Sequence, residues 1–164
     1  MKNYFTWKKK FFSETYRIFD KGKQIGTFRN RPFSQTSDAE INGKQYRFKT
    51  KGFFQQHTEI RDDKDGTLIG EIRYGSWRTR ATISLQNKTY KWKYDNIWSS
   101  KWSLTDGSSV HLNYAGSSTS GRVESNTDDD LLLLLGLYVM NYFWQATIIV
   151  LIAVFLPIWL SATH

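Results

Sequence analysis

Cysteine is absent from this chain of 164 residues, and histidine is scarce. Without cysteine the chain has no disulfide framework, no thiolate metal site and no cysteine nucleophile. The absence of cysteine therefore does not indicate whether the protein resides in an oxidising or a reducing compartment.

Residue patterns typical of catalysis are also lacking. The sequence has no Gly-x-Ser-x-Gly, His-Glu-x-x-His or phosphate-loop spacing. Asp62, Asp63 and Asp65 resemble half of a calcium loop, but the twelfth position, where a carboxylate is required, is Arg73. We therefore expect no enzymatic activity, no catalytic residue, no cofactor and no metal site. The histidines are His57, His111 and His164.

Charge is missing from the last part of the chain. Every Lys, Arg, Asp and Glu lies before Leu131, although the formal net charge of the whole chain is +8. Residues 1–127 alone are still more basic, because they exclude Asp128, Asp129 and Asp130. Such a surface attracts anionic partners, either nucleic acid or an acidic lipid leaflet.

Turn residues interrupt the first 127 residues at short intervals, and the segments between them alternate apolar and polar side chains. This pattern predicts a single domain, residues 1–127, built as a meander of antiparallel strands. Asn42-Gly43, Asp65-Gly66 and Asp106-Gly107 are typical hairpin turns. The expected strands lie near residues 2–10, 14–20, 23–30, 37–42, 44–51, 57–63, 67–74, 78–86, 88–95, 100–105, 109–115 and 120–126.

One face of these strands is apolar and the other is basic. Tyr46 and Phe48, for example, alternate with Arg47, Lys49 and Lys51. Since the apolar face should form the core, the fold class is mainly β, a closed antiparallel barrel or a sandwich with a basic outer surface. The basic positions that we predict to bind lipid are Arg47, Lys49, Lys51, Arg78, Arg80, Lys91 and Lys93.

Residues 128–160 are predicted to form one hydrophobic helix. Oxygen-bearing side chains before Leu131 can cap its first turn, and Pro157 can kink or end it. A twelve-stranded barrel is too wide to be filled by its own side chains, so we expect a helix inside it. Residues 131–145 have a polar-edged stripe and should thread the barrel, whereas residues 146–160 should protrude or insert into a membrane.

Leu134 and Val139 would then lie in the core, and Ile149 and Val154 would lie outside it. The second half of the helix would span about 22 Å, less than the hydrocarbon core of about 30 Å. In an alternative arrangement the whole segment is one tilted transmembrane anchor behind an ordinary barrel or sandwich. Periodicity alone does not separate these arrangements, because a helix that is apolar all round suits protein or lipid equally.

The order of elements, short antiparallel strands followed by a strongly hydrophobic helix, resembles the tubby C-terminal-like superfamily, which includes LURP-one-related proteins and phospholipid scramblases. The resemblance covers nearly the whole chain and rests on architecture rather than on a motif. It implies a closed barrel around a central helix, an intracellular location and phospholipid or phosphoinositide binding without catalysis. No binding residue is carried over, because no Lys and Arg cluster matches the phosphoinositide pocket of tubby proteins. The lack of a Cys-rich palmitoylation stretch argues against scramblase activity in particular.

We expect a non-enzymatic, membrane-associated protein that binds anionic phospholipid through its basic surface, with the barrel on the cytoplasmic side. One alternative is a protein-interaction module held by a simple transmembrane anchor, in which the hydrophobic tail contacts another protein. A nucleic-acid binding module is the second alternative. It is disfavoured because stacking on bases needs aromatic and basic side chains on the same exposed face.

Overall fold

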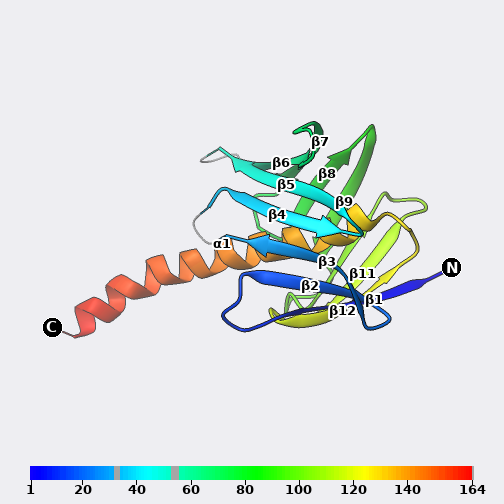
Figure 1. The fold of residues 1–164 in the computed structure, drawn as a ribbon. Helices are drawn as coiled ribbons and strands as arrows, with labels where there is room; N and C mark the ends of the chain where they lie inside the picture. The colour runs from blue at the N-terminus through cyan, green and yellow to red at the C-terminus, as the bar shows by residue number, and fades with distance from the viewer. Residues whose placement is uncertain (32–33, 53–55, 164) are drawn as a thin grey trace.

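The computed structural model of the protein describes residues 1–31, 34–52 and 56–163. Within these residues the chain forms twelve antiparallel strands and then one long helix, α1 (Figure 1). Each strand pairs with the next, and β1 pairs with β12, so the sheet closes into a barrel and the expected fold class is confirmed. The strands are β1 (Asn3–Lys9), β2 (Thr15–Asp20), β3 (Lys23–Asn30), β4 (Thr36–Ile41), β5 (Lys44–Lys51), β6 (His57–Asp62), β7 (Leu68–Tyr74), β8 (Arg80–Leu85), β9 (Lys88–Tyr94), β10 (Lys101–Thr105), β11 (His111–Gly116) and β12 (Ser120–Ser125).

Consecutive turns lie at alternate ends of the barrel, because neighbouring strands run in opposite directions. The turns Lys21-Gly22, Asn42-Gly43 and Gln86-Asn87 share one end, and their φ values lie between +46° and +83°, as two-residue hairpins require. α1 (Asp130–Ala162) begins at this same end, which we call the helix-start end. The turns after β1, β3, β5, β7, β9 and β11 lie at the opposite end, which we call the helix-exit end.

Strand boundaries agree with the predicted ranges to within about two residues. The sequence predicts that β8 begins at residue 78, but the strand begins at Arg80. Arg78 has a φ of 55°, and its backbone N–H donates to the Gly75 carbonyl at 3.2 Å. Arg78 therefore belongs to the β7–β8 turn, because a left-handed residue interrupts the extended backbone of a strand.

Alternating side chains of the strands point into the barrel and form its core. Phe48 and Trp92 are buried, for example, whereas Lys49 and Lys93 next to them are exposed. The aromatic rings of neighbouring strands pack on one another: Tyr16 of β2 stacks on Phe28 of β3 with ring centroids 5.3 Å apart. The apolar faces predicted from the alternation thus line the inside of the closed sheet.

The start of α1 is capped by a carboxylate. The side chain of Asp129 accepts a hydrogen bond from the backbone N–H of Leu131 at 3.0 Å, and its charge lies at the positive end of the helix dipole. Asp130 accepts a hydrogen bond from the side chain of Asn42 in the β4–β5 turn at 2.6 Å. These contacts fasten the first turn of α1 to the helix-start end.

The helix continues beyond the point where we expected it to end. α1 has 33 residues and runs through Pro157 to Ala162, rather than stopping at residue 160 or earlier. Proline removes one backbone donor, so the i to i−4 hydrogen bond to Ala153 is lost. The residues on both sides of Pro157 keep helical conformation, so this single loss does not end α1.

The first half of α1 fills the interior of the barrel (Figure 1). Its residues from Leu132 to Asn141 are buried, and its side chains belong to the same core cluster as the inward side chains of the strands. The indole N–H groups of Trp92 and Trp102 both donate to the Gly136 carbonyl, at 3.0 and 3.1 Å. Residues 131–145 therefore lie inside the barrel or at its helix-exit end. Leu134 and Val139 are fully buried.

Polar side chains along the first half of α1 meet partners on the barrel wall. The Tyr138 hydroxyl lies 3.2 Å from the Thr50 hydroxyl, and Asn141 accepts a hydrogen bond from Tyr16 at 2.9 Å. Close packing of apolar side chains, as of Gly136 against Tyr114, already restricts the position of the helix in the barrel. Since buried polar groups need partners, these contacts set both the rotation and the depth of α1.

We predict that the barrel does not fold without its helix. A chain ending at Asp128 should show no cooperative melting transition, because its inward aromatic side chains would face water. A chain ending at Ala146 is the matched control and should melt cooperatively, since it keeps the buried half of α1. Circular dichroism and size-exclusion chromatography would test both. A soluble, monomeric and cooperatively melting chain that ends at Asp128 would contradict the prediction.

A second prediction concerns Gly136. A Cβ atom at this position would overlap the ring and hydroxyl of Tyr114, whose O–H donates to the Leu132 carbonyl at 3.0 Å. Gly136→Ala should lower the free energy of unfolding by about 1–3 kcal/mol, as overpacking does, although alanine favours an isolated helix by about 1 kcal/mol. In a double-mutant cycle with Tyr114→Leu the loss should be less than additive. Chemical denaturation measures the free energy of unfolding of each variant. A Gly136→Ala protein that is more stable than the unaltered chain would contradict the predicted steric overlap.

Candidate functional site

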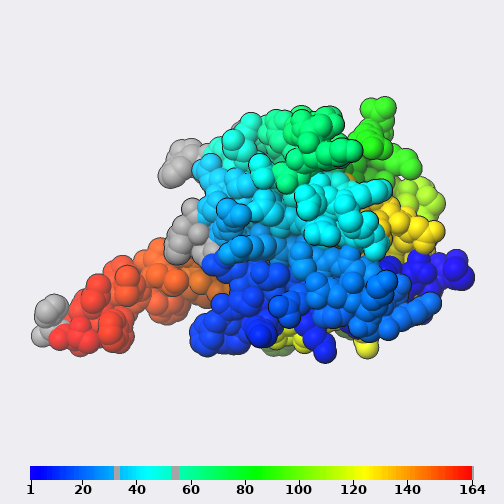
Figure 2. Space-filling model, viewed as in Figure 1, coloured from blue at the N-terminus to red at the C-terminus, as the bar shows by residue number. Residues whose placement is uncertain are grey.

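The second half of α1 leaves the barrel and exposes an apolar surface. Figure 2 shows it projecting away from the strands. Every side chain from Ile149 to Leu160 is exposed, and none is charged. Ile149 is 60 % exposed and Val154 is 52 % exposed, whereas Leu134 and Val139 are fully buried. By length and composition α1 could cross a membrane.

Two cations of the barrel contact α1 where it leaves the helix-exit end. The ammonium group of Lys9 lies 5.2 Å from the ring centroid of Tyr16 and 5.3 Å from that of Trp144. Partial burial between these rings lowers the pKa of Lys9. The guanidinium group of Arg78 donates to the Ala146 carbonyl at 3.0 Å. Positive charge is therefore held directly beside the exposed apolar helix.

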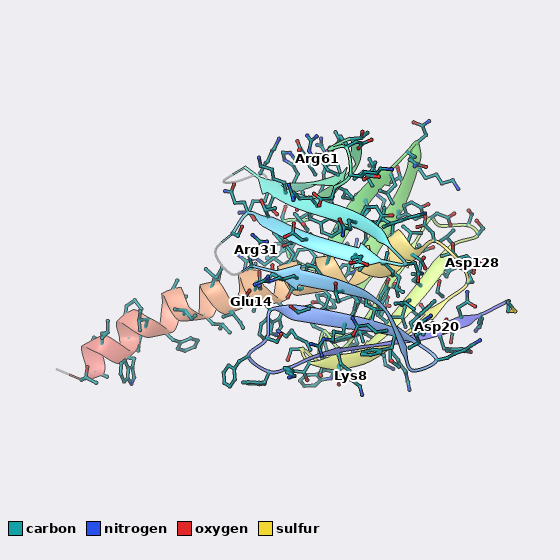
Figure 3. All side chains as sticks on the ribbon, viewed as in Figure 1. Lys8, Glu14, Asp20, Arg31, Arg61 and Asp128 are labelled. Carbon is teal, nitrogen blue, oxygen red and sulfur yellow. The ribbon has the colours of Figure 1, made fainter. Side chains whose placement is uncertain are left out.

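Charge is distributed unevenly between the two ends of the barrel. Figure 3 shows Glu14 and Arg31 on the side where α1 leaves, and Asp20 and Asp128 on the opposite side. At the helix-start end the charges nearly balance. Its carboxylates are Asp20, Glu40, Asp62, Asp63, Asp65, Asp106, Glu124, Asp128, Asp129 and Asp130, and its basic residues are Lys2, Lys21, Lys23, Lys44, Arg47, Arg61, Lys64 and Lys88. The basic residues of the helix-exit end are Lys8, Lys9, Lys10, Arg17, Arg29, Arg31, Lys49, Lys51, Arg73, Arg78, Arg80, Lys93, Lys101 and Arg122.

Carboxylates are fewer at the helix-exit end. They are Glu14, Asp38, Glu59, Glu71 and Asp95. We call the basic residues of this end, together with the exposed helix that they surround, the exit surface. Its excess of positive charge attracts anions and repels cations.

Most of the basic residues predicted from the sequence lie in the exit surface. Arg47 differs, because it lies in the half of β5 nearer the helix-start end and pairs with Asp38 at 3.4 Å and Asp63 at 2.8 Å. Lys91 lies in the middle of β9, near the hydroxyl of Thr82. The predicted residues that the structure brings together at the exit end are Lys49, Lys51, Arg78, Arg80 and Lys93.

Some of these cations already have carboxylate partners. Lys51 pairs with Glu59 at 2.6 Å, and hydrogen bonds from Lys51 and Arg61 hold the pKa of Glu59 below its usual range. Lys93 lies 3.6 Å from Asp95. Such exposed pairs contribute about 0–1 kcal/mol to stability, so their cations remain available to an anionic ligand.

A cleft lies beside α1 in the exit surface. Its lining includes the cationic side chains Arg73 and Arg78, together with His57 and Tyr142. The Tyr142 ring stacks on Tyr74 with centroids 3.7 Å apart, which fixes one wall of the cleft. Arg73 pairs with Glu71 at 3.3 Å, and Arg78 donates to the Ala146 carbonyl. Each guanidinium group has further N–H donors, so the cleft can accept an anion.

Metal-binding clusters are absent from the part of the chain that the structure describes, where no three His, Asp or Glu side chains converge. The carboxylates Asp62, Asp63 and Asp65 lie in and beside the β6–β7 turn. There Asp62 and Asp65 each accept a hydrogen bond from a backbone N–H two residues further on, at 2.8 Å. The hairpin turn accounts for these residues.

Several cations of the exit surface were not predicted from the alternation pattern. These cations lie near strand ends or in turns, where alternation along a strand is a weak guide to the direction of a side chain. They are Lys8, Lys10, Arg31 and Lys101. Chain topology could have found them, because alternate turns of a meander must meet at one end.

Comparison of the chain with protein-family models, with curated proteins and with solved structures found no match.

We predict that charged substitutions in the two halves of α1 have different effects. Leu134→Asp or Val139→Asp would bury an unpaired carboxylate, costing several kcal/mol against a total stability of about 5–15, so the domain should unfold. Ile149→Asp or Val154→Asp should leave the melting temperature nearly unchanged, because these side chains are exposed, and should weaken membrane attachment. Melting curves and membrane fractionation would distinguish them. A stable Leu134→Asp protein would contradict the prediction.

Proposed function

We propose that this protein is a non-enzymatic, membrane-attached barrel that binds anionic phospholipid. In this proposal the exposed part of α1 inserts into the bilayer, and the basic residues around it contact lipid head groups. The observation that carries the proposal is the gathering of lysine and arginine at the helix-exit end, around the point where an apolar helix emerges.

The length of the exposed helix supports insertion. Residues 147–162, beyond the contacts of Lys9 and Arg78, extend for about 24 Å at about 1.5 Å per residue, which is most of the hydrocarbon thickness of about 30 Å. α1 ends at Ala162, two residues beyond the end predicted from the sequence. Exposing so many large apolar side chains to water is unfavourable, and a hydrocarbon environment removes this cost.

Electrostatics supports the choice of an anionic lipid. Each Lys or Arg near an anionic leaflet contributes about 1 kcal/mol to binding, and the cations of the exit surface are close enough to α1 to act together. Anionic lipids are concentrated in the cytoplasmic leaflet, so we place the barrel on the cytoplasmic side.

We also propose that the chain is a tubby-like barrel. Support comes from the order of elements, since a closed antiparallel barrel is followed in sequence by a helix that fills it. Nucleic-acid binding is less well supported. Most strand aromatics face the core, and the exposed aromatic side chains among the basic residues, Phe11, Phe12, Trp77 and Trp98, lie at turn tips beside an exposed apolar helix, which suits lipid better than nucleic acid.

Vesicle binding tests this function. The full chain should prefer vesicles containing phosphatidylserine over pure phosphatidylcholine, and the preference should shrink as salt screens the charges. Reversal of three exit-end charges, Lys49→Glu, Arg80→Glu and Lys93→Glu, should reduce the preference about a hundredfold, at about 1 kcal/mol for each charge.

The matched control reverses three charges at the helix-start end, Lys21→Glu, Lys44→Glu and Lys88→Glu. This variant has the same net charge but should keep most of the preference, because those residues lie about a Debye length or more from the exit surface. Co-sedimentation with vesicles measures both variants. Equal binding of the unaltered chain to neutral and anionic vesicles would refute lipid charge selectivity.

A further inference from the structure

Exposed apolar side chains form the tips of three turns at the helix-exit end. Phe12 in the β1–β2 turn is 94 % exposed, Trp77 in the β7–β8 turn is 89 % exposed, and Trp98 in the β9–β10 turn is 81 % exposed. Phe11 and Ile97 beside them are also exposed. We call these five residues the apolar tips.

The apolar tips surround the place where α1 leaves the barrel. The β1–β2 turn follows Lys9, which contacts Trp144, and the β7–β8 turn contains Arg78, which contacts Ala146. The ring of Tyr94, which immediately precedes the β9–β10 turn, lies 6.5 Å from Phe143. Figure 1 shows the β1–β2 turn, in dark blue, on the side where the helix emerges. The tips and the exposed helix therefore belong to one end of the molecule.

Turns at the helix-start end have no comparable apolar tips among the described residues. The tips of these turns are polar or glycine, as in Lys21-Gly22, Asn42-Gly43 and Gln86-Asn87, and Val110 in the β10–β11 turn is partly buried. In the described part of the chain outside α1, the remaining strongly exposed large apolar side chains are Met1, Tyr4 and Leu68, which lie near the helix-start end but not at a turn tip. Apolar tips are thus a property of one end and not of hairpin turns in this chain generally.

We propose that the helix-exit end stands directly on an anionic bilayer, with the apolar tips inserted at the boundary between head groups and acyl chains. This inference rests on the proposed function, because it takes α1 to be inserted. Tryptophan and phenylalanine favour this boundary, where an indole ring is in contact with acyl chains while its N–H reaches water or a head group.

Charge complementarity identifies the bilayer as the occupant of this surface. Lys8 and Lys10 precede the β1–β2 tip, Arg78 and Arg80 follow Trp77, and Lys101 follows the β9–β10 turn. An apolar side chain pointing into acyl chains with lysine or arginine just behind it matches the layered chemistry of an anionic membrane surface. The helix-start end, which has no comparable excess of positive charge, would then face the solvent, away from the negatively charged leaflet.

Single-cysteine labelling tests this orientation, since the chain has no cysteine of its own. An environment-sensitive NBD fluorophore is attached to Phe12→Cys, Trp98→Cys, Gln86→Cys or Ile149→Cys in the full chain. The proteins are mixed with phosphatidylserine–phosphatidylcholine vesicles, with and without nitroxide-labelled lipids. Unchanged melting curves would show that these exposed positions tolerate the label.

We expect labels at Phe12, Trp98 and Ile149 to shift to the blue, to brighten severalfold and to be quenched by nitroxide lipids. The label at Gln86, at the helix-start end, should stay unchanged. If the label at Ile149 is embedded in the bilayer while the labels at Phe12 and Trp98 remain in water, the apolar tips do not insert. That outcome would overturn this inference and leave the proposed function unchanged. An aqueous Ile149 label would overturn the proposed function, and with it this inference. A Gln86 label that is as embedded as the others would overturn the orientation.

A second pair of variants measures what the tips contribute. Trp77→Ser with Trp98→Ser should lower vesicle partitioning severalfold without changing the melting temperature. The matched control is Tyr4→Ser with Leu68→Ser, which removes exposed apolar side chains away from the exit surface and should leave partitioning unchanged. Equal partitioning of both variants and the unaltered chain would overturn a role for the tips.

Discussion

The width of the closed sheet is the constraint on which the rest of this structure depends. A barrel with this many strands encloses more space than its inward side chains can fill, and an unfilled apolar interior forfeits van der Waals contacts along its whole lining. The chain supplies the filling from its own C-terminal segment. The core is therefore shared between strands and helix, and neither part has a complete hydrophobic core without the other.

A helix that fills such a barrel must be apolar on all sides, because the wall surrounds it. The same property makes the continuation of the helix suitable for lipid, so one segment serves two apolar environments without a change of composition. The border between the barrel interior and the proposed lipid environment is set by specific contacts near the helix-exit end. Tyr138 and Asn141 find polar partners on the wall, and Lys9 and Arg78 hold the helix where it emerges.

Topology gives the molecule two unlike ends. Since the strands form a simple meander closed between β1 and β12, the helix must begin at the end where β12 finishes and emerge at the other. The carboxylates that cap the helix gather at the first end, together with short polar hairpins. Lysine, arginine and the apolar tips gather at the second. Helix, charge and tips thus point in one direction, which is the basis of the membrane orientation that we propose.

The sequence by itself determined the strands, the inward faces and the hydrophobic helix. Alternation along β5 and β9 reports burial directly, and residues such as Asn42-Gly43 favour left-handed turn conformations locally. That Phe12, Trp77 and Trp98 share one end follows from the predicted meander, because their turns come after β1, β7 and β9. Only the tertiary structure decided where α1 leaves the barrel and that Arg47 is paired away from the other cations. Local sequence is silent on these points, because they depend on strand direction, barrel closure and contacts between residues far apart in the chain.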